Sequence, residues 1–372
     1  MLTWKTSTAF RLLTALLLGL LSCAVTTSPL QAQGKGGGYS AVRLAFPGAA
    51  TRSTTALKLN DRANVVGTYR DAGNLTCGFH YDQATGSYTS LGVLVSAEGI
   101  NQQDAMVGYD EFVGRGLYWS SPTAVPIPLP PLPGHTHSRA HAINSAGIIV
   151  GASYIPEDPP TTPGYRAVVA WYVNATGSVL GPVELPFLTG DLVGRANDLT
   201  EAVAGVTSVV GASGLNDSLP VFWSVTVAES GLVVTGPALF GGNYFLAEAR
   251  GVNNFGDAVG MVAWAADSAA APFLRRAGQF MVPLPMLPKA VSGLATSIND
   301  AGRIVGFQSI FQKGQGMQSR AVLWTNSTTV VDLNSQVSLG SSETLDYAID
   351  INRRGDILAR INGNTPCLLI AK

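Results

Sequence analysis

The sequence predicts a seven-bladed β-propeller of four-stranded blades, and three observations predict it. A short motif recurs seven times, apolar runs of strand length follow the motif, and the two ends of the chain complement each other. The composition agrees, because 46% of the residues are hydrophobic, only 13% are charged, and there are 42 glycines and 21 prolines. Such a profile is typical of short buried strands joined by tight turns.

The motif reads Ala-x-x-(Ile/Leu/Val)-Asn, a turn, two apolar residues and Gly, which predicts a strand, a tight turn and a second strand. The sixth copy shows it from Ala295 through Asn299 to Gly306. Its asparagine position recurs every 41 to 56 residues, which brackets the blade length of propellers, at Asn60, Asn101, Asn144, Thr200, Asn253, Asn299 and Asn352. The fourth copy is degenerate, with Thr200 and an insertion at 201–207, and the seventh ends in Ala359 instead of glycine.

Two further apolar runs complete each unit. The third run ends in an aromatic residue in five copies, at 79–81, 117–119, 168–171, 221–223 and 322–324. Four of the six tryptophans hold this position: Trp119, Trp171, Trp223 and Trp324. A repeated tryptophan predicts packing between blades rather than cofactor stacking. A fourth run, such as 87–91, 178–185 or 329–333, makes four strands per blade.

The chain ends predict how the ring closes. The seventh unit stops after its third run, at Leu368 and Leu369, while an orphan strand at 39–46 precedes the first motif. We therefore expect the N-terminal strand to complete the last blade, which removes two exposed sheet edges. Cys77 and Cys367 could pair in an oxidising compartment. They fall on equivalent strands of the first and last units, which disfavours the short Cα separation of a disulfide, so two small buried residues are favoured.

The N-terminal segment predicts export. Lys5 and Arg11 precede an apolar stretch at 12–25, which is the pattern of a signal peptide. Cleavage after Ala32 divides the chain into a signal peptide (1–32), a glycine-rich linker (33–38) and the propeller (39–372). The mature protein is then secreted, periplasmic or on the cell surface, with no transmembrane segment. Lipid attachment at Cys23 is the alternative, which the second apolar residue at position 21 disfavours.

No recognised catalytic motif, metal signature or cofactor-binding loop is found in the sequence. The formal net charge of −1 disfavours nucleic acid and anionic membranes as partners. His135, His137 and His141 cluster without neighbouring carboxylates, so a polar surface loop is favoured over a metal site. His141 fills the variable position after the repeat alanine, which the other copies fill with Leu57, Glu98, Asn197, Arg250, Thr296 and Ile349.

Loop lengths point to a ligand face. If strands alternate in direction, the loops between second and third strands and the loops between blades emerge on one face, and the long insertions 153–164, 263–271 and 308–318 fall there. The candidate ligand residues on this face are His135, His137, His141, Tyr154, Glu157, Tyr165, Trp264 and Phe311.

Four segments of the sequence resemble the HAF family of bacterial extracellular repeats: Phe46-Pro47-Gly48-Ala49, Asn60 to Gly67, Ile143 to Gly151 and Ile298 to Gly306. The resemblance spans residues 39–372 and implies an exported repeat protein with no established activity. It supplies no catalytic residues to assign.

Three functions stay open at this point. A binding or surface-interaction module for an extracellular polysaccharide or a surface protein, acting as a monomer and without cofactor or catalysis, is favoured because catalytic motifs are lacking. A secreted polysaccharide lyase or glycoside hydrolase is the second possibility, and a structural envelope component is the third. Carboxylates, histidine and arginine converging in the central channel would favour the enzyme, and an aliphatic channel would favour the binding module.

Overall fold

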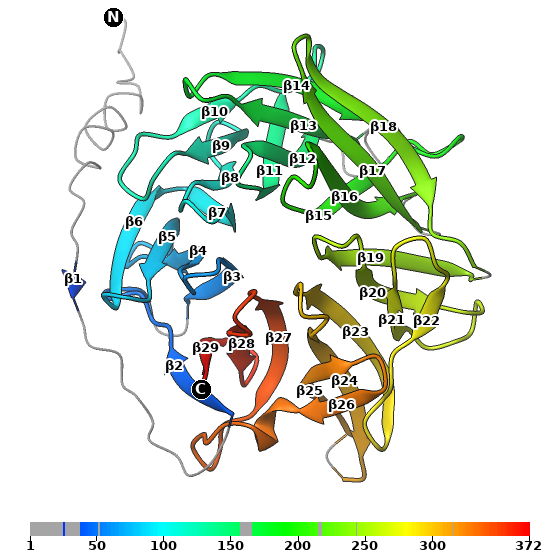
Figure 1. Cartoon of the computed structure of the whole chain (residues 1–372). Helices are drawn as coiled ribbons and strands as arrows, with labels where there is room; N and C mark the ends of the chain where they lie inside the picture. The colour runs from blue at the N-terminus through cyan, green and yellow to red at the C-terminus, as the bar shows by residue number, and fades with distance from the viewer. Residues whose placement is uncertain are drawn as a thin grey trace, which may run out of the picture.

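The described residues form seven antiparallel sheets arranged in a ring, which confirms the predicted seven-bladed propeller (Figure 1). The computed structural model describes residues 25–26, 38–50, 53–156, 166–214, 218–242, 244–314 and 316–372. The first strand of every blade lies nearest the central axis, and the first strands of neighbouring blades contact one another around the ring (Figure 1).

The first four blades follow the chain in order. Blade 1 contains β3 (Thr55–Leu59), β4 (Val65–Arg70), β5 (Thr76–Asp82) and β6 (Ser87–Val93), with the short β1 (Val25–Thr26) beside β6. Blade 2 contains β7 (Val95–Ile100), β8 (Met106–Asp110), β9 (Arg115–Trp119) and β10 (Ile127–Leu129). Blade 3 contains β11 (His137–Ile143), β12 (Ile148–Tyr154), β13 (Arg166–Val173) and β14 (Val179–Leu185). Blade 4 contains β15 (Gly194–Leu199), β16 (Val206–Ser213), β17 (Leu219–Ala228) and β18 (Gly231–Leu239).

The last three blades complete the ring. Blade 5 contains β19 (Leu246–Val252), β20 (Ala258–Ala263), β21 (Ala271–Arg275) and β22 (Met281–Pro283). Blade 6 contains β23 (Ala290–Ile298), β24 (Ile304–Gln312), β25 (Gly316–Asn326) and β26 (Thr329–Asp332), followed by the 3₁₀ turn η1 (Leu333–Ser335). Blade 7 contains β27 (Leu345–Ile351), β28 (Ile357–Ile361), β29 (Thr365–Ala371) and, from the other end of the chain, β2 (Tyr39–Arg43).

Strand β2 closes the ring as predicted. It pairs antiparallel with β29, from Tyr39 opposite Ala371 to Arg43 opposite Cys367. Val42 is buried in the hydrophobic cluster between blades 7 and 1, and Ala41 is buried in the cluster between blades 6 and 7. The pair formed by β2 and β29 therefore holds blades 6, 7 and 1 together. Cys77 and Cys367 are free and buried, which confirms their predicted packing role.

The repeated asparagine explains why the motif recurs. In each regular copy its side-chain oxygen accepts backbone N–H groups of its own turn, as Asn299 Oδ1 does from Ala301 (3.1 Å) and Arg303 (3.0 Å). Its side-chain Nδ2 donates to the backbone carbonyl of the matching residue in the next blade, as Asn299 does to Asn352 (2.9 Å). The donors to the next blade are Asn60, Asn101, Asn144, Asn253, Asn299 and Asn352, which we call the asparagine ring.

The asparagine ring is interrupted only where the sequence is degenerate among the described repeats. The backbone carbonyl of Thr200 accepts a hydrogen bond from Asn144 Nδ2 (3.0 Å), but the threonine side chain has no amide that could donate to blade 5. Other groups connect these two blades: Glu201 N–H donates to Asn254 Oδ1 (2.8 Å), and Val252 N–H donates to Asp198 Oδ2 (3.1 Å). The fourth copy is thus a complete blade, despite its divergent turn.

The repeat alanine and glycine have a steric origin. They pair across the first two strands, and every blade has a β-bulge directly after the alanine. A Cβ atom on the repeat glycine would lie 1.8–2.0 Å from a carbonyl oxygen of the first strand, so only glycine fits in six blades. Blade 7 has Ala359 at this position.

The repeated tryptophans pack between blades, as predicted. All four are buried, and three donate their indole N–H to a proline carbonyl in the connection that follows the preceding blade. These bonds join Trp171 to Pro130 (2.8 Å), Trp223 to Pro186 (2.7 Å) and Trp324 to Pro285 (2.8 Å).

Two local expectations were wrong. Residues 308–318 were expected as a loop, but strands β24 and β25 extend through most of this stretch as a paired hairpin, with Phe311 opposite Met317. His137 and His141 were expected in a surface loop, but both lie in β11. The bulge after Ala140 interrupts the two-residue alternation by which a strand is recognised in sequence.

The asparagine ring predicts a stability difference between two similar turns. Asn299→Ala should lower the free energy of unfolding by about 2–3 kcal/mol, because the buried carbonyl and turn N–H groups lose their partners. Asn174→Ala is the matched control, since Asn174 makes the same turn bonds to Thr176 and Ser178 on an outer hairpin. It should cost roughly 1 kcal/mol or less. Equal losses in urea titrations would contradict the interblade role.

Candidate functional site in the central channel

A cavity of about 720 Å³ occupies the wide end of the central channel. It opens on the face of the blade-to-blade connections, which we call the loop face, because Val193 before β15 and Gly214 after β16 both line it. Its volume lies in the range of roughly 300–1,000 Å³ that is typical of small-ligand sites.

The bulge position supplies one side chain from every blade to this cavity. The residue after each repeat alanine lines the wall: Leu57, Glu98, His141, Asn197, Arg250, Thr296 and Ile349. Because the bulge leaves this residue unpaired in the ladder, its side chain can turn toward the axis while the alanine remains buried between blades. Seven copies of one backbone feature thus present seven different side chains to the same space.

Glu98 organises one part of the wall. Its Oε1 accepts hydrogen bonds from Arg139 Nε (2.7 Å) and Ser96 Oγ (2.9 Å), and its Oε2 lies 2.9 Å from His141 Nδ1. Burial alone would raise the pKa of Glu98, but the bonds from His141 and Arg139 outweigh it and lower the pKa to about 2. Glu98 is therefore a carboxylate at neutral pH.

Glu248 lies beside the cavity and holds three residues of its wall: Arg195, Asn197 and Arg250. It is 2% exposed and lies between Arg195 (3.5 Å) and Arg250 (3.1 Å), with Asn197 Nδ2 also donating to it (2.9 Å). One buried carboxylate thus faces two partly exposed guanidinium groups. Arg250 Nε is buried and has no hydrogen-bond partner among the described residues, so this side chain retains an unused donor.

Lys58 separates the wide cavity from the rest of the channel. Its Nζ lies 3.3 Å from Asp198 of blade 4 and 3.5 Å from Asp350 of blade 7. Burial would lower the pKa of Lys58, but the two carboxylates outweigh this effect and raise it. Lys58 lines both the wide cavity and a smaller one of about 130 Å³ on the far side.

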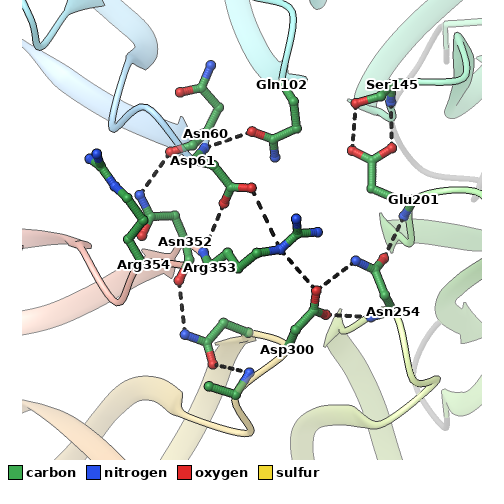
Figure 2. Close-up of polar contacts among 12 residues, drawn as sticks. Asn60, Asp61, Gln102, Ser145, Glu201, Asn254, Asp300, Asn352, Arg353 and Arg354 are labelled. Carbon is green, nitrogen blue, oxygen red and sulfur yellow. Dashed lines mark hydrogen bonds and ion pairs between the residues drawn. The ribbon is translucent and has the colours of Figure 1, made fainter.

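The far side, which we call the asparagine face, is closed by a second tier of polar contacts (Figure 2). The residue after the repeat asparagine position contacts its counterpart in the next blade in most copies: Asp61 N–H donates to Gln102, Ser145 to Glu201, and Asn254 to Asp300. Arg353 joins the ends of this chain, because its N–H donates to Asp61 and its Nε to Asp300. This tier narrows the channel to a small polar space.

The two ends of the channel differ in charge. Among the described residues, the wide cavity is lined by Lys58, Arg139, Arg195 and Arg250 against one carboxylate, Glu98. The small cavity is lined by Asp61, Asp198, Glu201, Asp300 and Asp350 against two cations, Lys58 and Arg353. Lys58 is already paired with Asp198 and Asp350, and Arg139 is paired with Glu98, so the excess of cations at the loop face comes from Arg195 and Arg250, which share Glu248. This excess favours a negatively charged ligand at the loop face.

The predicted site residues fall into three groups. His141 lines the wide cavity. His135 Nδ1 lies 2.9 Å from Ser153 Oγ, and His137 packs against the ring of Tyr154, whose hydroxyl contacts Tyr109 (3.4 Å). Tyr109 in turn packs against the cavity residue Arg139, so these residues form a rim outside the cavity lining.

The remaining candidates lie elsewhere. Trp264 follows β20 and Phe311 lies in β24, and both are exposed and line none of the described cavities. Glu157 and Tyr165 lie outside the described residues.

Sequence reasoning missed Glu98, Arg139, Arg195, Glu248 and Arg250. The signal was present, because the position after the repeat alanine varies most visibly between copies. However, the orientation of this residue depends on a bulge, and Arg139 and His141, which hold Glu98, lie one blade away, at 41 or more residues in sequence. Within the described residues, no group of three or more His, Cys, Asp or Glu side chains is arranged to hold a metal ion. No described helix is long and apolar enough to cross a membrane.

The sequence matches no family model, and no curated protein is significantly similar to it. Solved structures similar to this fold include the β-propeller domain of the Trilobed protease from Pyrococcus furiosus, with a TM-score of 0.50 and 9% identity over 84% of this chain and 94% of that one. An acylaminoacyl peptidase is similar at a TM-score of 0.50 and 10% identity, over 85% of this chain. This chain spans only 52% of that peptidase.

A polysaccharide lyase is also similar, at a TM-score of 0.48 and 12% identity over 92% of this chain and 94% of that one. The similarity to the β-propeller domain of the Trilobed protease is consistent with the propeller fold. At such identities these similarities assign no activity, which therefore has to be argued from the channel itself.

The Lys58 contacts predict a pH-dependent defect. Lys58→Met should lower the free energy of unfolding by about 3 kcal/mol at neutral pH, because two buried carboxylates lose their cation. Burial already holds the pKa of Asp198 above its ordinary value, although Lys58 opposes this effect. Loss of Lys58 should raise the pKa of Asp198 further, so protonation of this carboxyl group should relieve the defect as pH falls. The deficit relative to the natural protein should be larger at pH 8 than at pH 5 in urea titrations. Lys313→Met, at an exposed site, should show neither effect, and a pH-independent deficit would contradict the charge assignment.

Proposed function

We propose that the protein binds a negatively charged sugar, or a negatively charged segment of a polysaccharide, in the wide end of its central channel. The observation that carries the proposal is the wall formed by Arg195, Glu248 and Arg250. Two guanidinium groups share one buried carboxylate, so one positive charge is left without a counterion. An anion that enters the cavity can pair with this charge without displacing an existing ion pair.

The other lining groups favour a hydroxylated ligand over a bare ion. Asn197, Thr296 and Tyr347 place an amide and two hydroxyl groups around the same cavity. Burial raises the pKa of Tyr347, although Arg250 and Arg360 oppose it, so its hydroxyl remains a neutral donor and acceptor. Charged groups for an acid and polar groups for hydroxyls are the combination that an acidic sugar requires.

The export predicted from residues 1–32 belongs to this proposal, since it would bring the cavity into contact with extracellular polymers. So does membership of the HAF family, which the repeat resembles. A protein ligand and a purely structural role both predict that no sugar binds in the cavity, which the following test measures.

Calorimetric titration of residues 33–372 should detect acidic but not neutral sugars. Oligomers of galacturonate, of glucuronate, and of a sulfated sugar are the probes, with maltotriose as the neutral control. Arg250→Gln should weaken binding of the acidic probe at least about tenfold, because a charge-assisted bond is lost. Higher salt should weaken it too.

Arg70→Gln is the matched control, because it removes the same charge from an exposed residue of β4 outside the cavity and should leave affinity unchanged. Equal binding of maltotriose, an unaffected Arg250→Gln variant, or no binding of any acidic probe would overturn the proposal.

A further inference from the structure

The bond to Glu98 determines which ring nitrogen of neutral His141 carries the proton. Ionised Glu98 has only acceptor atoms, so the hydrogen between Glu98 Oε2 and His141 Nδ1 belongs to the imidazole. In neutral His141 the proton therefore resides on Nδ1, and the lone pair resides on Nε2. The tautomer follows from the hydrogen-bond network around Glu98, where Arg139 and Ser96 also donate.

The second ring nitrogen of His141, Nε2, is not held by Glu98, and the side chain lines the wide cavity. His141 occupies the bulge position of blade 3, and its side chain is 31% exposed in the wide cavity. Among the described residues, no group hydrogen-bonds to its Nε2, whereas Nδ1 is held by Glu98. A neutral imidazole that is fixed through one nitrogen and open at the other has the arrangement of a general base.

The carboxylates of the cavity argue against glycoside hydrolysis. That reaction uses a pair of carboxyl groups, one of which must carry a proton that it donates to the leaving oxygen. Glu98 is ionised and fully engaged, and Glu248 is buried between two arginines. Asp198 and Asp350 are bound to Lys58 and line the small cavity, not the wide one. The wide cavity thus offers a base and cations, but no carboxylic acid.

We infer that the wide cavity catalyses β-elimination on a uronate-containing sugar chain, with His141 as the catalytic base and Arg195 and Arg250 holding the substrate carboxylate. This inference rests on the proposed binding function and names its substrate class. A carboxylate whose charge is neutralised by two guanidinium groups can accept electron density from the adjacent carbon, which makes the hydrogen on that carbon more acidic.

The step balances without a cofactor. His141 Nε2 takes the proton from the carbon next to the carboxylate, and the electron pair of that C–H bond forms the new C=C bond. The bond from the neighbouring carbon to the glycosidic oxygen breaks, and the oxygen leaves with the electron pair of that C–O bond. It takes a proton from water, since the cavity opens to solvent, and His141 returns its proton to water. Glu98 is a positioning residue, because it fixes the tautomer without contacting the substrate.

The test measures binding and product formation on the same samples. Galacturonate and glucuronate oligomers are incubated with residues 33–372, and the unsaturated uronate product is followed by its ultraviolet absorbance. The natural protein should form product, and His141→Gln should reduce the rate at least about 100-fold while affinity changes less than about twofold. His137→Gln is the matched control, since His137 lies on the rim outside the wall, and should keep full activity.

Glu98→Gln should lower kcat more than it changes KM, because the substrate contacts remain but the imidazole loses its fixed tautomer. Binding without product would overturn this inference and leave the proposed function intact. An active His141→Gln variant would overturn the role of His141. Absence of binding would overturn both.

Discussion

The structure depends on one side chain used six times. Seven inner strands have to meet around a single axis, and each turn there must satisfy its own backbone groups in a space that is too small for much water. The asparagine amide meets both needs, since Oδ1 holds its own turn and Nδ2 holds the next blade. A threonine or serine could satisfy the turn but could not also donate an amide to the neighbour, and blade 4 shows this limit at Thr200.

The same repeat separates scaffold from function. The alanine must be small because it is buried between blades, and the glycine opposite it must lack a Cβ, so these two positions can hardly vary. The bulge directly after the alanine releases the following residue from the sheet and directs it toward the channel. The strand ladder places no demand on that residue, and the seven blades supply unlike chemistries there. His141, Asn197 and Arg250, from three consecutive blades, come from the same position of the motif.

Much of the fold could be predicted because its determinants are local. The alanine, asparagine, glycine and tryptophan of each copy report their roles within one blade, and the orphan strand at 39–46 matches a strand missing at the other end. The site could not be predicted in the same way. The bulge turns the side chain of His141 toward the channel, and the neighbouring residues of the sequence give no sign of it. The ion pairs of Glu98 with His141, of Glu248 with Arg195 and of Lys58 with Asp198 join blades and residues that are far apart in sequence. Attention to long loops selected Trp264 and Phe311, whereas the charged groups converge on the inner strands.

The central claim is that ligand chemistry resides in the bulge positions of the wide channel end, not in the loops around it. A crystal structure of the His141→Gln variant soaked with trigalacturonate tests this most directly, because a bound but unreacted sugar can be placed. The account predicts a uronate carboxylate between Arg195 and Arg250, with the sugar chain passing residue 141. Sugar density confined to the outer loops, or to the asparagine face beyond Lys58, would contradict it.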